Sequence, residues 1–583
     1  VFQKKKGKFP PMPKTSVHVV YNHVQTSVMP ELSGTALAQT YLHHDPSAEE
    51  VIDFNNGAVA LATKTNIELI RALGVFNVCG FPWIVQNART MYNTATKVFG
   101  QTIPDLAVGI SFFSHFCGGR SAEELRPVMK RLGSHGVGAI LDYAAEADVV
   151  DENHTELSGP NKQNDIDTII KMSEAHCEAN TRVIFHAIDA AAQAQEDGGM
   201  QGFAAVKLTG MGRPELLERM STILTWLRAV FSQMDTSGDG KISHEQFKAG
   251  LQNLKVALTD EEEAALFDTM DVDKNGQVDL HEWLDGLSPS SPVSAPLFES
   301  KFQILSSAGL SALTETERNQ LASMLNRLER VAAYADSKGV KMLVDAEQTY
   351  MQPAIDHLTL LLMERYNTNH AVIFNTYQCY LVDSYKRVVA DIERAERNGF
   401  VFGAKMVRGA YMVQERRLAK LRGYADPIHE NIQATHDNYN AVIEMVLRYK
   451  AAPAVPEAGV MKRRATALML ASHNEKSVAR AVQLMAELGI PRKESGVYFG
   501  QLQGMCDHVS YMLGEKQYAV YKYLPYGPVK EVMPYLLRRA EENGDLMSGV
   551  GKERKMIEKE IKRRVFEALG FAAKSKKEYS VAH

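Results

Sequence analysis

Short runs of β-favouring residues alternate along most of the chain with segments whose apolar residues recur at helical spacing. The eight runs are 138–144, 203–210, 341–348, 371–378, 403–411, 467–474, 496–502 and 519–527. This alternation favours a parallel sheet with helical crossovers, and eight is the number of strands in a closed (β/α)₈ TIM barrel. An open doubly wound sheet is the alternative, but it normally carries a GxGxxG turn after its first strand, which this sequence lacks.

Most of the β runs end in side chains that can take part in chemistry. These side chains are Lys207, Asp345, Gln378, Tyr411, His473 and Tyr523. Barrels keep their active sites at the C-terminal ends of their strands. Polar residues satisfied by local hydrogen bonds would explain one or two of them, but six in succession favour an active site.

The N-terminal part of the chain follows a different pattern. Residues 1–50 are rich in Pro, His and polar groups and predict an extended arm, whereas residues 50–130 have helical apolar spacing. We therefore assign 1–130 to an N-terminal arm with helices and 131–214 to the first part of the barrel. A chain that begins at Val1 and not at Met is compatible with removal of an upstream targeting segment, of which the run Lys4, Lys5, Lys6 and Lys8 would be a remnant. We favour the alternative that these lysines belong to a solvated, flexible terminus.

Composition narrows the class of protein. The 583 residues carry a net charge of −5, which argues against a nucleic-acid binder because that class needs a basic footprint. The five cysteines are dispersed without a CxxC pair, as expected for thiols in a reducing compartment. No apolar stretch approaches the roughly 18 residues that span a bilayer, so any membrane contact should be peripheral.

Residues 215–297 interrupt the barrel pattern with a predicted all-α pair of EF-hands, after which 298–583 complete the barrel. A Ser/Pro-rich linker is expected at 288–296. In the second hand, oxygen ligands occupy loop positions 1, 3, 5, 7, 9 and 12, and Gly276 occupies the sharp turn. These ligands are Asp271, Asp273, Asn275, Gln277, Asp279 and Glu282. The sequence therefore predicts a Ca²⁺ site.

The first hand is a weaker candidate. Its ligands would be Asp235, Ser237, Asp239, Lys241 (through its carbonyl) and Ser243. Position 12 is Gln246, whose neutral amide lacks the charge and the bidentate grip of glutamate. We expect this loop to bind calcium weakly or to have a structural role.

The segment 521–544 contains a further constellation, where a strand ending near Tyr523 and a PYGP turn precede a helix. On that helix Tyr535, Arg538, Arg539 and Glu542 are spaced i, i+3, i+4 and i+7 and share one face. Paired arginines suit bidentate binding of a carboxylate. A solvent-facing Arg/Glu ladder is the alternative for this motif taken alone.

The run YLPYG at 523–527 with YLLRRAEEN at 535–543 resembles the signature of proline dehydrogenases. Other family landmarks follow in order: LDY at 141–143, VKLTG at 206–210, VDAEQ at 344–348, KMVRGAY at 405–411, ASHN at 471–474 and FGQLQGM at 499–505. The resemblance covers nearly the whole chain outside 215–297. It implies a distorted (β/α)₈ barrel that binds FAD and oxidises L-proline to Δ1-pyrroline-5-carboxylate. For eukaryotic members it also implies peripheral association with the matrix side of the mitochondrial inner membrane and ubiquinone as electron acceptor.

The resemblance also implies roles for individual residues. Arg538, Arg539 and Lys207 would bind the substrate carboxylate, Tyr523 and Tyr535 would pack on its ring, Glu542 would order the arginines, and Asp345 would support the site. The residues matching cofactor-contacting positions are Gln378, Lys405, Arg408, Gly409, Ala410, Tyr411, Ser472, His473, Asn474 and Gln501. Around Gln501 the spacing departs by one residue from that of bacterial relatives.

Two other functions stay open at this point. Hydroxyproline dehydrogenases resemble this chain too, but in that subfamily the position of Tyr523 holds a smaller polar residue that admits the 4-hydroxyl group. A calcium-binding scaffold with an inactive barrel is the second alternative. The intact Tyr/Arg/Glu helix face weighs against it.

Overall fold

The computed structural model describes residues 52–144, 162–290, 313–452, 455–457, 460–462 and 466–569, apart from positions 198, 255, 257 and 546. The arm predicted over residues 1–50 and most of the linker predicted over 288–296 lie outside the described residues.

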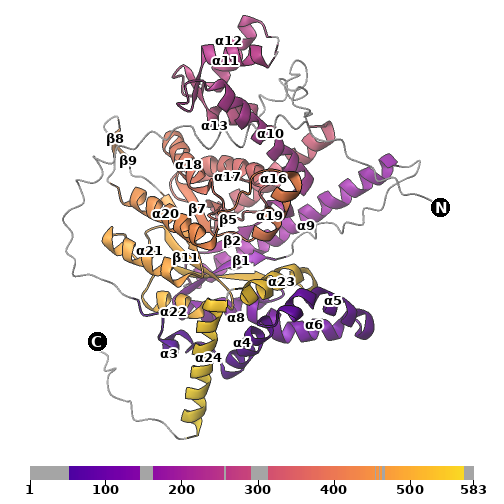
Figure 1. The fold of residues 1–583 in the computed structure, drawn as a ribbon, viewed down its shortest axis with the longest axis vertical. Helices are drawn as coiled ribbons and strands as arrows, with labels where there is room; N and C mark the ends of the chain where they lie inside the picture. Colours follow the sequence, from indigo (N-terminus) through magenta and orange to yellow (C-terminus); the bar gives the residue numbers. More distant parts are fainter. Residues whose placement is uncertain are drawn as a thin grey trace.

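Eight parallel strands close into a barrel in the order β1-β12-β11-β10-β7-β6-β5-β2, at the centre of the molecule in Figure 1. The strands are β1 (Val137–Tyr143), β2 (Phe203–Val206), β5 (Lys341–Val344), β6 (Ile373–Gln378), β7 (Phe402–Val407), β10 (Thr466–Ala471), β11 (Val497–Leu502) and β12 (Val520–Tyr526). Each of the eight predicted runs overlaps one of them, and β1, β7 and β10 each begin one residue earlier than predicted. The barrel is closed because β12 pairs with β1 along seven residues, from Val137 opposite Val520 to Tyr143 opposite Tyr526, which excludes the open sheet.

Helices surround the barrel. After β1 and β2 come α9 (Lys162–Glu196), η2 (Leu208–Gly210), α10 (Pro214–Met234) and α16 (Glu315–Ser337); the later ones are α17 (Gln352–Tyr366), α18 (Ser384–Asn398), α19 (Met412–Arg422), α20 (Ile432–Ala451), α21 (Glu475–Glu487), α22 (Asp507–Glu515), α23 (Val529–Asp545) and α24 (Met547–Ala568). A small antiparallel pair, β8 (Val455–Glu457) and β9 (Val460–Lys462), follows α20. One large apolar core joins the outer faces of the strands to these helices.

A second core fills the barrel itself. Alternate residues of the strands point inward, and Ile140, Phe203, Leu343, Phe374 and Tyr521 are among those that pack there. Because side chains alternate along a strand, residues two or four positions beyond these also point to the barrel axis, at its C-terminal end.

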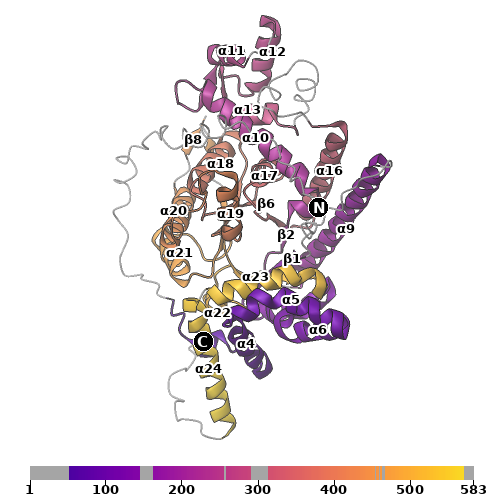
Figure 2. The same cartoon turned by 45° about the vertical axis from the view of Figure 1, so that its right-hand side comes forward.

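The N-terminal helices pack beside the barrel, against α23 and α24, as Figure 2 shows. They are α3 (Gly57–Ala60), α4 (Asn66–Cys79), α5 (Pro82–Phe99), α6 (Thr102–Val108), the π-helix η1 (Gly109–Phe113), α7 (Ser114–Phe116) and α8 (Ala122–Gly133). Thr65 and Glu68 form a capping box at the start of α4. Buried residues of α4, α5 and η1 share one apolar cluster with Val532, Tyr535 and Leu536 of α23, so the N-terminal helices hold α23 in place.

The insertion consists of two helix–loop–helix units at one end of the molecule (Figures 1 and 2). They are α10 with α11 (His244–Asn253), and α12 (Asp260–Met270) with α13 (Leu280–Leu287). Their loops are joined by the short strands β3 (Lys241–Ser243) and β4 (Gln277–Asp279), which pair Ile242 with Val278. The indole of Trp283 donates to the Leu227 carbonyl (2.9 Å) and fixes α13 to α10.

Candidate active site

Inward-pointing polar residues converge at the C-terminal end of the barrel. Asp142, Lys207, Asp345 and Lys405 each come from a different strand or from the residue just after it, and Tyr523 lies within β12. The strand predicted to end near Tyr523 continues to Tyr526, so Tyr523 points into the barrel mouth rather than standing at its rim. Similarly, β7 ends at Val407 and Tyr411 lies four residues beyond it, at the start of α19.

Asp345 is the hub of this cluster. Its carboxylate accepts hydrogen bonds from the Lys405 ammonium and from the Tyr523 hydroxyl (2.7 Å). The Lys207 Nζ lies 3.7 Å from the same carboxylate and 2.7 Å from Asp142 Oδ1. Two lysines and two aspartates therefore form one connected, charge-balanced group.

The charge states of this group follow from burial and pairing. Burial disfavours the Asp345 carboxylate, but Lys405 and Lys207 outweigh it and lower its pKa. Burial raises the pKa of Asp142 despite Lys207. Burial and the two carboxylates raise the pKa of the Tyr523 phenol well above its ordinary value. Tyr523 is therefore a fixed hydrogen-bond donor to Asp345 at neutral pH.

Glu347 is a further buried carboxyl group of this region. It lies in the VDAEQ run but is not among the predicted site residues. It accepts from the Thr209 amide (3.2 Å) and hydroxyl (2.7 Å), and burial raises its pKa to about 7. The Gln378 side chain donates to the Glu347 carbonyl (2.8 Å). Asp142 is likewise absent from the predicted site residues. It lies two positions after Ile140, whose side chain points inward, and this spacing predicts that the Asp142 side chain points inward as well.

Helix α23 brings the predicted Tyr/Arg/Glu face to the barrel. Tyr535 and Arg539 are buried, and the Arg539 guanidinium stacks on the Tyr535 ring 5.0 Å from its centroid. Arg539 also pairs with Glu542, as the i, i+3 spacing predicts. Burial raises the pKa of Glu542, and the two arginines oppose the shift. The motif is thus not a solvent-facing ladder, because Tyr535 and Arg539 are buried and Arg538 and Glu542 are only partly exposed.

A third group of predicted residues surrounds Arg408, just beyond β7. Its guanidinium donates to His436 Nδ1 (2.9 Å), Ser472 Oγ (2.6 Å) and Ser477 Oγ (2.8 Å), and stacks on Tyr439 (4.1 Å). These partners are neutral groups, so they orient Arg408 without neutralising it. Such a cation suits an anionic ligand.

The remaining predicted cofactor residues lie on both sides of Arg408. Gly409 (φ +127°) and Ala410 are exposed in the segment before Tyr411, and a Cβ at Gly409 would lie 2.4 Å from the Tyr380 ring. On the other side, Asn474 caps the N-terminus of α21. A 13-residue helix that begins beside Arg408 adds a favourable electrostatic end for phosphate.

His473 and Gln501 differ in what they can offer to a ligand. His473 Nε2 accepts the Leu502 amide (3.0 Å), and burial lowers its pKa to about 3, so the neutral ring carries its proton on Nδ1. The Gln501 side chain is buried and uses both ends within the protein, donating to the Ser472 carbonyl (3.2 Å) and accepting from Ser510 (3.0 Å).

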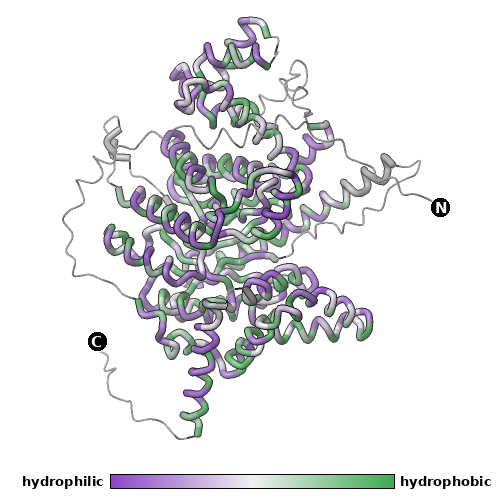
Figure 3. The backbone as a smooth tube through the Cα atoms, viewed as in Figure 1, coloured by the Kyte–Doolittle hydropathy of each residue, from purple (hydrophilic) through white to green (hydrophobic). Residues whose placement is uncertain are grey.

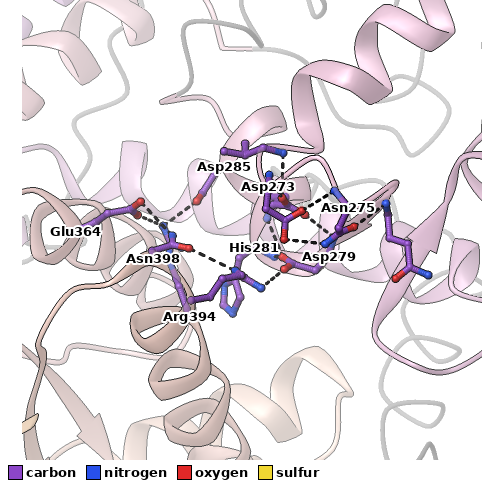
Figure 4. Close-up of polar contacts among 12 residues, drawn as sticks. Asp273, Asn275, Asp279, His281, Asp285, Glu364, Arg394 and Asn398 are labelled. Atoms are coloured by element: carbon purple, nitrogen blue, oxygen red, sulfur yellow. Dashed lines mark hydrogen bonds and ion pairs between the residues drawn. The ribbon is translucent and has the colours of Figure 1, made fainter. Parts of the chain in front are cut away.

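The second insertion loop gathers carboxylates. Ligand oxygens of Asp271, Asp273 and Glu282 lie within 4.8 Å of one another, and Figure 4 shows Asp273, Asn275 and Asp279 turned toward one another. Burial and the neighbouring Asp279 and Asp273 charges raise the pKa of Glu282. The loop thus concentrates negative charge in one place.

The first insertion loop is closed differently. The Gln246 amide donates to the Thr236 hydroxyl (3.0 Å) and to the Ser237 hydroxyl (3.1 Å). Ser237 in turn donates to Asp235 (3.1 Å) and Asp239 (3.0 Å). N–H and O–H donors therefore occupy the positions in this loop where a bound cation would need oxygen lone pairs.

The second loop also touches the barrel (Figure 4). Arg397 of α18 pairs with Asp279, at loop position 9. Arg394 of the same helix is almost fully buried and pairs with Asp285 (2.7 Å) and Glu364 (3.1 Å). Helix α18 leads directly into β7, which carries Lys405.

Comparison with known proteins gives a consistent assignment. A family model described as proline dehydrogenase matches residues 127–552. The chain is 36% identical over 562 residues to "Proline dehydrogenase 1, mitochondrial" of Caenorhabditis elegans, covering 88% of each chain, and 36% identical over 561 residues to the protein of that name from Homo sapiens, covering 88% of this chain and 90% of the other. It is 33% identical over 519 residues to "Hydroxyproline dehydrogenase" of Xenopus laevis, covering 89% and 91%.

Among solved structures, proline utilization A (PutA) from Bdellovibrio bacteriovorus, inactivated by N-propargylglycine, resembles this chain with a TM-score of 0.50 and 16% identity. The match covers 85% of this chain and 38% of the PutA chain, so this protein spans less than half of that larger one. The likeness supports the barrel fold.

Proposed function

The chain belongs to the proline dehydrogenase family, and we propose that it catalyses the FAD-dependent oxidation of L-proline to Δ1-pyrroline-5-carboxylate, with a quinone as the electron acceptor. The observation that carries this proposal is the buried, stacked Tyr535–Arg539 pair of α23, whose tyrosine is an electrostatic neighbour of Tyr523 in the barrel mouth. Proline loses a hydride from C5 and a proton from its nitrogen, and both electrons finally reduce the quinone.

The substrate would be held mainly by its carboxylate. Arg538, Arg539 and Lys207 supply the cationic groups, and arginine binds a carboxylate bidentately. Tyr535 and Tyr523 provide aromatic surface for the ring. Because Glu542 fixes one guanidinium and Asp142 fixes Lys207, these donors are arranged before the substrate arrives, which lowers the entropic barrier to reaction.

Residues around Arg408 would hold the cofactor. FAD, when bound, supplies the redox chemistry by taking up the electrons that leave the substrate. The neutral partners of Arg408 leave its charge available for an anionic group, and the start of α21 suits phosphate. His473 can donate from Nδ1, whereas we assign Gln501 a supporting role because its amide is already engaged.

L-proline is the preferred substrate in this proposal. The Tyr523 ring is fixed by the hydrogen bond to Asp345 and fills the space that a 4-hydroxyl group would need. The greater identity to proline dehydrogenases than to the hydroxyproline enzymes agrees with this choice. Turnover of trans-4-hydroxyproline that exceeds turnover of L-proline would reverse the assignment.

The absorbance spectrum of the pure protein tests the proposal directly. We expect a flavin band near 450 nm that bleaches when L-proline is added without an acceptor. Protein that is colourless and cannot take up added FAD would favour the scaffold alternative instead. We place the enzyme in mitochondria because its relatives carry mitochondrial names, and on the matrix side of the inner membrane because the family resemblance implies it; fractionation of cells tests this placement.

We further propose that the loop 271–282 binds one Ca²⁺ ion as an EF-hand. The converging oxygens of Asp271, Asp273 and Glu282 support this site, since calcium favours six to eight oxygen ligands. The donors turned into the first loop argue for weaker binding there. Calorimetric titration of the full chain should give one tight equivalent, and heat from neither loop would contradict the proposal.

A further inference from the structure

Six exposed apolar side chains form a ridge on the N-terminal helices. Trp83, Met91 and Val98 lie on α5, Ile103 and Leu106 lie on α6, and Ile110 lies on η1. We call these six the apolar ridge. Ten of the twenty large apolar side chains exposed in the described part of the chain fall between residues 67 and 110, so the ridge is a concentration and not the scatter that is normal for a protein surface.

The spacing of these residues is that of a helix face built for burial. Ile103, Leu106 and Ile110 stand at i, i+3 and i+7 and so share one stripe, yet they are 56%, 59% and 65% exposed. Trp83, Met91 and Val98, at i, i+8 and i+15, also lie on one side of α5. Figure 3 shows the apolar stretches of α5 and α6 at the outer edge of the molecule.

The opposite faces of the same helices are already used. Val85 and Phe113 are buried in the cluster that includes Tyr535 of α23. The ridge is therefore a second apolar surface on elements that support the candidate active site. Folding of the described chain leaves it uncovered.

Charge around the ridge indicates the kind of surface it fits. Residues 66–113 carry five charged side chains. The two acidic ones are engaged within the protein: Glu68 binds Arg131 and the Thr65 amide, and Asp105 accepts from the Tyr92 hydroxyl (2.5 Å). Lys97 is exposed and lies next to Val98. The charge that the ridge presents outward is thus positive.

The helices are too short to cross a bilayer. No single described helix is long and apolar enough to span one; α4 and α5 pass such a test only together, and they meet at a 99° bend. A bent, apolar, weakly cationic surface suits insertion along the membrane plane, with the apolar side chains entering the acyl boundary and lysine near the headgroups.

We infer that the apolar ridge is the surface by which this protein docks on an anionic lipid bilayer. This inference rests on the proposed function in one respect: a quinone dissolved in the lipid would reach the enzyme from the side where α5 packs on α23. Binding of lipid itself requires no catalysis, so it can be tested separately.

The test uses the full chain and vesicles of phosphatidylcholine with a quarter phosphatidylglycerol. Wild type should sediment with these vesicles, and its tryptophan emission should shift to the blue because, of its three tryptophans, Trp83 is exposed whereas Trp226 is half-buried and Trp283 is buried. The variant I103S/L106S/I110S should lose about tenfold or more of its vesicle affinity. The control M172S/I432S removes exposed apolar side chains from other helices and should bind as wild type does.

Two activity measurements separate this inference from the proposed function. With a water-soluble acceptor, the triple variant should match wild type; with a quinone dissolved in the vesicles, it should be slower. Equal vesicle binding by wild type and the triple variant would overturn the inference. So would a wild-type dimer that the triple substitution makes monomeric without any change in vesicle binding, because the ridge would then be covered by a second copy.

Discussion

The barrel mouth and the second insertion loop are electrostatic opposites. At the barrel mouth, three cationic groups each pair with a carboxylate: Lys207 with Asp142, Lys405 with Asp345 and Arg539 with Glu542. In the loop 271–282, carboxylates converge, and burial together with the neighbouring Asp279 and Asp273 charges raises the pKa of Glu282. The first region is balanced by its own side chains, whereas in our proposal the second is balanced by a bound Ca²⁺ ion.

This difference teaches where each region should be sensitive to substitution. Removing one charge from a balanced group leaves its buried partner uncompensated. The resulting loss of folding stability exceeds the net stability that the intact pair contributes. Removing a carboxylate charge from the proposed calcium loop should lower the affinity for Ca²⁺ and relieve the repulsion between the carboxylates when no ion is bound. Four predictions test this contrast, from the largest expected effect to the smallest.

The largest effect is expected for Arg539→Met. It removes a buried carboxylate donor and leaves Glu542 without its ion pair, so kcat/KM for L-proline should fall by about a thousandfold, mainly through KM. Steady-state kinetics measure this change. Lys530→Met, which removes an exposed cation from the same helix, is the matched control and should behave as wild type. An unchanged KM in Arg539→Met would refute the proposed carboxylate clamp.

Glu347→Gln tests whether burial controls charge in the barrel. The folded-state pKa of Glu347 is raised to about 7, so the folded protein binds this proton more tightly than the unfolded chain does. Its contribution to stability is present below about pH 4.5 and is lost as pH rises toward 7. Stability of wild type relative to the variant should therefore fall by on the order of 3 kcal/mol across that range.

Urea unfolding at several pH values measures this difference. The substitution Glu515→Gln, which removes an exposed carboxylate from the surface, is the control. A flat difference for Glu347→Gln would mean that burial does not disfavour this carboxylate.

In the insertion, Glu282→Gln and Gln246→Glu should act in opposite directions. Glu282→Gln removes the bidentate ligand and should weaken calcium binding by about a hundredfold. Gln246→Glu replaces donors with a carboxylate in the first loop and should add a second calcium equivalent. Calorimetry measures both, and equal stoichiometry in wild type and Gln246→Glu would show that position 12 does not distinguish the two loops.

The smallest effect is expected for Arg397→Ala. Arg397 partly neutralises Asp279, and it is partly exposed, so its removal should tighten calcium binding only about threefold. The opposite result, weaker binding, would show that docking on α18 orders the loop more than it competes with the ion. Arg365→Ala, at an exposed ion pair on α17, is the control.

The sequence predicted the two regions by different routes. The proposed calcium loop at 271–282 is predicted from spacing alone, because its candidate ligands all lie within twelve residues. The barrel strands are predicted by their β runs. The convergence of Lys207, Asp345 and Lys405, however, depends on closure of the barrel, and their proposed roles come from the family resemblance. His436 and Tyr439, which orient Arg408, lie on α20 and give no local signal. The pairing of Arg397 with Asp279 joins residues 118 apart, beyond any local pattern.

The pairing of β12 with β1 sets an order of assembly. The ring is sealed by its final strand, and the helix bearing both arginines comes after that strand. When the polypeptide emerges N-terminus first, from a ribosome or through a translocation pore, the strand Val137–Tyr143 cannot pair with β12 until residue 526 is free. Premature stop codons upstream of this point should therefore give products without any residual turnover, because the edge of β1 stays unpaired and the helix α23 is missing.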